Sequence, residues 1–150
     1  EKIEESLLSK TRDFHHKIMG FDKSPSAVEK AIQNVENAKL EDFIYIKHED
    51  FFKTQKGGEE HLHMVFNPPY GERLDIEMES FYSSIGSTLK HKYPGTNAWM
   101  ISSNLEALKH IGLRPSKKIK LFNAKLEARF LKYEMYAGTK KTHKLKSKNN

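Results

Sequence analysis

The residues Asn67-Pro68-Pro69-Tyr70 have the types needed to bind and activate an amino group on a planar base. Proline has no backbone N–H, so the two prolines fix the chain and leave carbonyl oxygens without local donors. The side-chain oxygen of Asn67 and the carbonyl of Pro68 can each accept one N–H of such an amino group. Tyr70 offers an aromatic plane on which the base can stack. The same four residues also fit a proline-terminated strand followed by a core tyrosine.

Two aspartates favour the interpretation as a site. Asp22, Asp50 and Asn67 each follow a strand-like segment, at 17–21, 42–47 and 62–66. Ligands of open α/β sheets bind beyond the carboxyl ends of the strands, where a carboxylate can accept both hydroxyls of a ribose. A second carboxylate there can accept from an adenine amine. A single aspartate is also common at strand ends and helix caps. Three successive strands that are each followed by a polar residue, however, favour a ligand site.

The elements that must position these residues alternate between strand and helix patterns. A helix is expected to begin near Ser24 or Ser26, and an apolar stripe predicts another over 75–91. Further segments are a strand at 98–101, a short helix ending at Gly112, and strands at 117–122 and 128–136 joined as a hairpin. The order predicts an α/β fold with a mostly parallel sheet, helices on both faces and a C-terminal antiparallel hairpin.

Composition and charge restrict the class of protein. The chain has 150 residues, a length typical of one domain, and no cysteine, which excludes thiolate metal sites and cysteine nucleophiles. It lacks a run apolar enough for a membrane helix, and we expect a cytoplasmic protein. Residues 1–108 carry 13 Lys/Arg and 18 Asp/Glu, whereas residues 109–150 carry 13 Lys/Arg and two Glu. This basic end indicates a polyanionic partner such as nucleic acid, or else a solvated tail; we expect 139–150 to be disordered.

Asn67-Pro-Pro-Tyr70, followed by Gly71-Glu72-Arg73-Leu74, resembles the signature of class I methyltransferases that act on base amines with S-adenosyl-L-methionine. Within that class, the chain resembles the THUMP-containing bacterial 23S rRNA guanine-N2 methyltransferases, a group also labelled as N6-adenine-specific DNA methylases. The segments 20–25, 48–52 and 121–133 resemble further motifs of this group, so the likeness extends over about 17–136.

The resemblance implies a Rossmann-like fold, a mechanism and a set of residue roles. Asp22 would bind the cofactor ribose, and Asp50 and Phe51 would meet its adenine. Asn67, Pro68, Pro69 and Tyr70 would hold the target amine, drawing electron density back to its nitrogen for in-line attack on the methyl group. For RNA we expect contacts from Tyr70, Arg73, Lys117 and Lys118, although Arg73 also fits a surface ion pair and the lysines a protected edge strand.

One family motif has no counterpart in the chain. The group carries a glycine-rich loop after its first strand, and no Gly-x-Gly occurs here. We therefore expect residues 1–138 to be the C-terminal part of a methyltransferase catalytic domain that lacks the first strand. The THUMP domain and the glycine loop would lie upstream, and the chain alone would bind cofactor poorly.

The sequence is also compatible with two other functions and contains one weak indication of a metal site. The chain fits a noncatalytic α/β module that binds nucleic acid, or a methyltransferase acting on adenine N6 of DNA. His61 and His63 have a metal-compatible spacing, but two ligands are too few, and we expect no metal.

Overall fold

The computed structural model describes residues 5, 13–58, 60–69, 76–123 and 125–137. They pack as two compact units, Glu1–Lys53 and Thr54–Asn150. Each unit is described by itself. The expected boundary between 138 and 139 falls outside the described residues. Within the described part of the chain, no helix combines the length and the apolar character that crossing a membrane requires.

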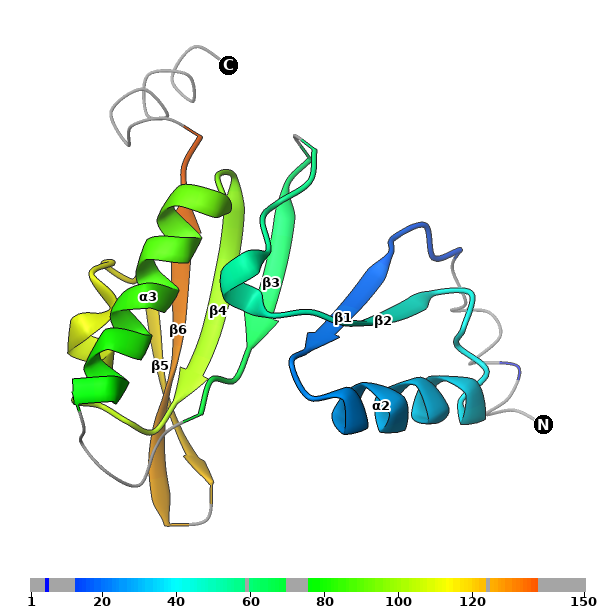
Figure 1. Ribbon diagram of the computed structural model, residues 1–150, viewed down its shortest axis with the longest axis horizontal. Coiled ribbons are helices and arrows are strands. Elements are labelled where there is room, and N and C mark those ends of the chain that lie inside the picture. Colours follow the sequence, from blue (N-terminus) through cyan, green and yellow to red (C-terminus); the bar gives the residue numbers. More distant parts are fainter. Residues whose placement is uncertain (1–4, 6–12, 59, 70–75, 124, 138–150) are drawn as a thin grey trace. The chain divides into compact units, whose positions relative to one another are not determined.

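The first unit is a small β-α-β arrangement (Figure 1). Its elements are β1 (Ile18–Asp22), α2 (Pro25–Asn37), β2 (Ile44–His48) and the 3₁₀ helix η1 (Phe51–Lys53). Strands β1 and β2 pair in parallel, with Ile18 opposite Ile44. Of the two expected helix starts, the earlier one is confirmed, because the Ser24 side chain accepts the Ala27 N–H at 3.4 Å.

The second unit contains a four-stranded sheet in the order β3-β4-β6-β5. Its elements are β3 (Leu62–Phe66), α3 (Ile76–Lys92), β4 (Thr96–Ser102), the 3₁₀ helix η2 (Ala107–Ile111), β5 (Lys117–Asn123) and β6 (Leu126–Met135). Strands β3 and β4 are parallel, while β6 is antiparallel to both β4 and β5. The expected parallel pairing and C-terminal hairpin are therefore confirmed.

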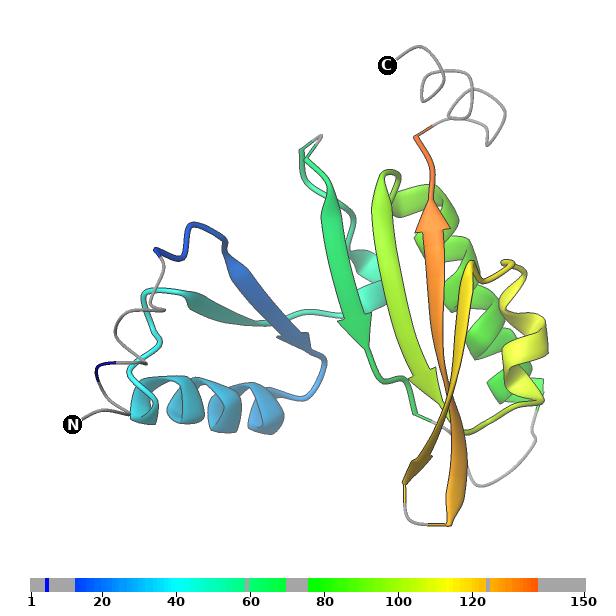
Figure 2. The same cartoon turned by 180° about the vertical axis from the view of Figure 1, so that it is seen from behind.

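The core of the second unit lies between α3 and the sheet. Tyr82, Ile85 and Leu89 of α3 are buried, as are alternate residues of β4 and β6, including Met100 and Tyr133. Seen from behind, the opposite face of the sheet carries no helix among the described residues (Figure 2). Trp99 and Phe130 stack on that face with their ring centroids 4.8 Å apart.

Two details differ from the sequence-based expectation. The short helix before Gly112 is a 3₁₀ helix rather than an α-helix, and the 3₁₀ helix η1 was not predicted. Gly112 ends η2 with φ 67°, a left-handed conformation that favours glycine. Among the described residues, the first unit contains the two-stranded sheet β1-β2 and the second the four-stranded sheet β3-β4-β6-β5.

Candidate active site

Asp22 is the last residue of β1, and its side chain is exposed. Its Oδ1 accepts the Ser24 N–H at 2.7 Å, so the carboxylate shapes the turn that leads into α2. Asp22 lies in register with His48, the last residue of β2. The carboxylate thus stands at the carboxyl end of the parallel pair, the place where α/β sheets bind ligands.

Asp50 lies two residues beyond β2 and is half-buried. Its Oδ1 accepts the Phe52 N–H at 3.1 Å, which fixes the start of η1, and its Oδ2 is 3.8 Å from the Lys23 Nζ. Phe51 begins η1 and is also half-buried, with its ring 5.5 Å from that of Phe52. A carboxylate and an aromatic ring are therefore held next to each other by one short helix.

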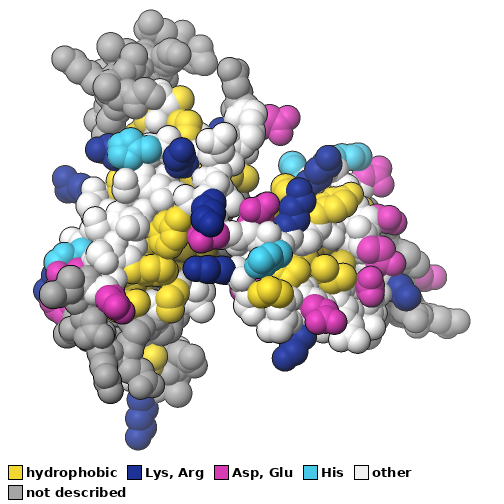
Figure 3. All heavy atoms as spheres, in the orientation of Figure 1, with side chains coloured by type: hydrophobic (Ala, Val, Ile, Leu, Met, Phe, Trp, Pro, Cys, Tyr) yellow, Lys and Arg dark blue, Asp and Glu magenta, His cyan; other side chains and the backbone are white. Residues whose placement is uncertain are grey.

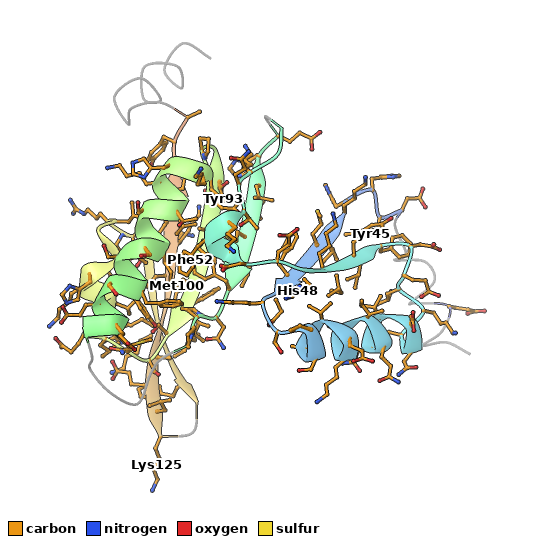
Figure 4. The ribbon with its side chains drawn as sticks, in the orientation of Figure 1. Tyr45, His48, Phe52, Tyr93, Met100 and Lys125 are labelled. Carbon is orange, nitrogen blue, oxygen red and sulfur yellow. The ribbon has the colours of Figure 1, made fainter. Side chains whose placement is uncertain are left out.

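His48, which was not among the residues predicted for the site, also contributes to this end of the first unit. Its Nε2 lies 2.8 Å from the carbonyl oxygen of Lys23, and because a carbonyl only accepts, this nitrogen carries the hydrogen. The imidazole thereby ties β2 to the turn after β1 (Figure 4). Asp22, Lys23, His48 and Asp50 thus form one polar cluster in the first unit.

Asn67, Pro68 and Pro69 directly follow β3 in the second unit. Asn67 and Pro69 are exposed, whereas Pro68 is buried. A buried proline ring anchors the segment while the neighbouring asparagine faces solvent. The arrangement confirms that a parallel strand ends at these residues. Tyr70 and Arg73 lie outside the described residues.

Two buried hydroxyl groups lie beneath this segment, and the contact between them was not predicted from the sequence. The Tyr82 Oη is 2.6 Å from the Ser102 Oγ and donates to the Pro69 carbonyl at 3.4 Å. The sequence placed Tyr82 only on the apolar stripe of a helix and Ser102 only at a cap. This contact could have been anticipated only from the general rule that a buried tyrosine hydroxyl needs a hydrogen-bond partner. Burial, with a smaller contribution from Tyr82, raises the pKa of Tyr133 in the same core layer.

The basic side chains of the hairpin are partly neutralised by acids. Glu127 lies 2.7 Å from both Lys120 and Arg129, and the hydrogen bond from Lys120 contributes most to lowering its pKa. Lys117 and Lys118 open β5 and are exposed. On the face seen in Figure 3, lysine and arginine side chains are interspersed with acidic ones.

His61 directly precedes β3, and His63 lies within it. The rings of His61 and His63 meet edge to face with their centroids 4.9 Å apart. Among the described residues, no group of three or more His, Asp or Glu side chains is placed to hold a metal ion.

The fold is that of a class I methyltransferase, as comparison with solved structures shows. A possible methylase from Clostridium difficile 630 superposes with a TM-score of 0.78 at 24% identity, over 93% of this chain and 37% of that one. SMU.472, a protein described as a methyltransferase and complexed with SAH, gives a TM-score of 0.78 at 25% identity, over 91% of this chain and 36% of that one.

Residues 2–132 match the family model UPF0020, described as the RMKL-like methyltransferase domain, and the chain belongs to this family. A ribosomal RNA large subunit methyltransferase K/L from Syntrophotalea carbinolica is 35% identical over 123 residues. Those residues are 79% of this chain but 17% of the relative, so the chain spans less than a fifth of that protein.

Proposed function

We propose that this chain is part of an enzyme that transfers a methyl group from S-adenosyl-L-methionine to an exocyclic amine of a nucleic-acid base. The observation that carries the proposal is the segment Asn67-Pro68-Pro69 at the carboxyl end of β3, with Asn67 exposed and no proline N–H to occupy the acceptors. Membership of a methyltransferase family supports it. The methyltransferase K/L relative supports ribosomal RNA as the substrate, and we propose guanine N2 as the target.

The reaction requires from the protein mainly hydrogen-bond acceptors for the amine and a fixed orientation of the reactants. The lone pair of an exocyclic amine is delocalised into the base ring, so the amine is a weak nucleophile. Asn67 Oδ1 and the Pro68 carbonyl would accept its two hydrogens and restore electron density to the nitrogen. One N–C bond would form as the S–C bond of the donor breaks, and the proton released from the nitrogen would pass to solvent. Tyr70 would stack on the base.

The first unit has acceptors that fit the cofactor. S-Adenosyl-L-methionine supplies a methyl group made electrophilic by its sulfonium. The exposed Asp22 carboxylate suits the ribose hydroxyls, and Asp50 with Phe51 suits the adenine amine and ring. A relative in this fold class is complexed with SAH, the demethylated cofactor, which supports this assignment.

The RNA contacts are proposed from charge and position. Lys117 and Lys118 are exposed at the start of β5, where they can reach phosphates, and Arg73 and Tyr70 follow the acceptor segment in sequence. An enzyme that modifies ribosomal RNA would work in the cytoplasm.

We infer that a further strand and a glycine-rich loop complete the cofactor site, with a THUMP domain in the same protein. Within the described residues, β1 and β3 each pair on one side only, which leaves backbone groups available for another strand. The length of the methyltransferase K/L relative, of which this chain spans 17%, supports additional segments.

Asn67→Ala in the full-length protein tests the assigned chemistry. We expect the rate of methyl transfer to ribosomal RNA to fall about a hundredfold, because one of two amine acceptors is lost, while RNA binding stays unchanged. Asn34→Ala, at an exposed position in α2, is the control. Full activity of Asn67→Ala would contradict its role. Methyl label in DNA rather than ribosomal RNA would favour the DNA enzyme, and RNA binding without any methyl transfer would favour the noncatalytic module.

A further inference from the structure

Tyr82 connects the acceptor segment to the end of the neighbouring strand. The residue is fully buried in α3, and Ser102, its partner at the end of β4, is also fully buried. Because β3 and β4 are parallel, their carboxyl ends lie at the same edge of the sheet. The Tyr82 hydroxyl therefore lies beneath both of the loops that leave this edge.

The Tyr82 hydroxyl belongs to a line of hydrogen-bonded groups. The Asn104 N–H donates to the Ser102 Oγ at 3.1 Å, and the Pro69 carbonyl accepts from Tyr82 at 3.4 Å. The Tyr82 and Ser102 hydroxyls lie 2.6 Å apart, in a hydrogen bond of which either can be the donor. The contacts therefore run from Asn104 through Ser102 and Tyr82 to Pro69.

Tyr82 provides a side-chain donor to the acceptor segment. Pro68 and Pro69 contribute no N–H of their own to this segment. The Tyr82 hydroxyl donates to the Pro69 carbonyl at 3.4 Å. Asn104, at the other end of the chain of bonds, is itself held because its Oδ1 accepts the Ala107 N–H at 2.9 Å, at the start of η2.

We propose that Tyr82 is a positioning residue for the reaction, which holds the Pro69 carbonyl and thereby orients the amine acceptors of Asn67 and Pro68. The proposal rests on the function proposed above. Tyr82 touches neither cofactor nor base in this scheme. It acts through the peptide that follows Pro68, and a small displacement of an acceptor is enough to slow a reaction that depends on orientation.

The test is Tyr82→Phe in the full-length enzyme, a change that keeps the ring and removes the hydroxyl. We expect kcat for methyl transfer to ribosomal RNA to fall about tenfold, while the KM for S-adenosyl-L-methionine stays within about twofold. Ser102→Ala, which removes the hydroxyl partner of Tyr82, should give a smaller loss of the same kind. Tyr45→Phe is the matched control, because the Tyr45 hydroxyl donates to the Asp42 carbonyl at the same 3.4 Å in the other unit.

Amide hydrogen exchange gives a second readout that needs no activity. Tyr82→Phe should speed exchange several-fold at the Asn104 amide, which donates to the Ser102 Oγ at 3.1 Å, and Tyr45→Phe should leave it unchanged. Unchanged exchange, an unchanged kcat in an active enzyme, or an equal loss in Tyr45→Phe would each overturn the positioning role. Faster exchange in Tyr82→Phe, in a protein whose wild type transfers no methyl group, would support the hydrogen-bonded cluster around Tyr82 but refute the proposed function.

Discussion

Gly86→Ala is expected to destabilise the second unit, against the usual effect of this substitution in a helix. Gly86 is buried in the middle of α3. A Cβ built on it would lie 1.6 Å from the carbonyl oxygen of Ile111, 2.8 Å from the carbonyl carbon and 3.3 Å from the Cγ1 of the same residue. The helix α3 thus approaches the backbone of η2 at a distance that only glycine permits.

The expected magnitude follows from two opposing contributions to the free energy of unfolding. Replacing glycine by alanine inside a helix ordinarily stabilises by about 1 kcal/mol, because the unfolded chain loses freedom. Here a normal contact of about 3.2 Å between carbon and oxygen requires α3 and η2 to separate by about 1.6 Å. The obstacle is backbone, which cannot rotate away, and overpacking costs about 1–3 kcal/mol or more. We expect a net loss of about 2 kcal/mol.

Urea unfolding followed by circular dichroism measures this loss. Gly57→Ala is the control, since a Cβ there meets no atom within 4 Å and its φ is not positive. The control should unfold at the wild-type urea midpoint or slightly above it. A Gly86→Ala variant as stable as the control would refute the close approach of α3 and η2.

Two further outcomes test the cofactor site and the ion pairs. In calorimetric titrations with S-adenosyl-L-methionine, we expect an N-terminally extended protein to bind and the 150-residue chain not to bind. Asp22→Asn, which keeps an oxygen for the Ser24 N–H, should weaken binding to the extended protein about tenfold through the lost charge. The pKa of Glu134 is lowered, first by the hydrogen bond from Lys132 and then by that from Tyr136. The charged Glu134 therefore stabilises the fold fully at pH values above its pKa in the unfolded chain. This stabilisation is lost as the pH falls through the lowered pKa of the folded state, so the thermal midpoint should decrease once the pH is below about 5. Glu134→Gln should reduce that drop; an identical pH profile would contradict the assignment.

Much of the secondary structure could be predicted because its signals are local. The apolar run of β3 is bounded by Asn67 and the prolines that follow, and the observed strand ends at Phe66 as expected. The alternating pattern of β5 and β6 likewise predicted the hairpin. Of the two 3₁₀ helices, η2 was predicted as a short helix that ends at Gly112. The other, η1, was not predicted, since it depends on Asp50 accepting the Phe52 N–H, an interaction without a distinct sequence pattern.

The candidate site was predictable only where single residues mark strand ends. The positions of Asp22, Asp50 and Asn67 follow from the strands that precede them, and the structure confirms those positions while their roles stay predictions. The link between Tyr82 and Ser102 joins residues twenty positions apart through tertiary packing. Periodicity assigns Tyr82 to the core, but it does not indicate which buried oxygen lies next to its hydroxyl.

The turn after β1 has a consequence for the entropy of ligand binding. An exposed side chain loses rotamer freedom when it binds a ligand. One oxygen of Asp22 is already restrained by the Ser24 amide at 2.7 Å, so much of this loss occurs during folding. The same Ser24 caps α2. The first turn of α2 and the affinity for any ligand of Asp22 are therefore coupled, and loosening that turn would be measured as an entropic penalty on binding.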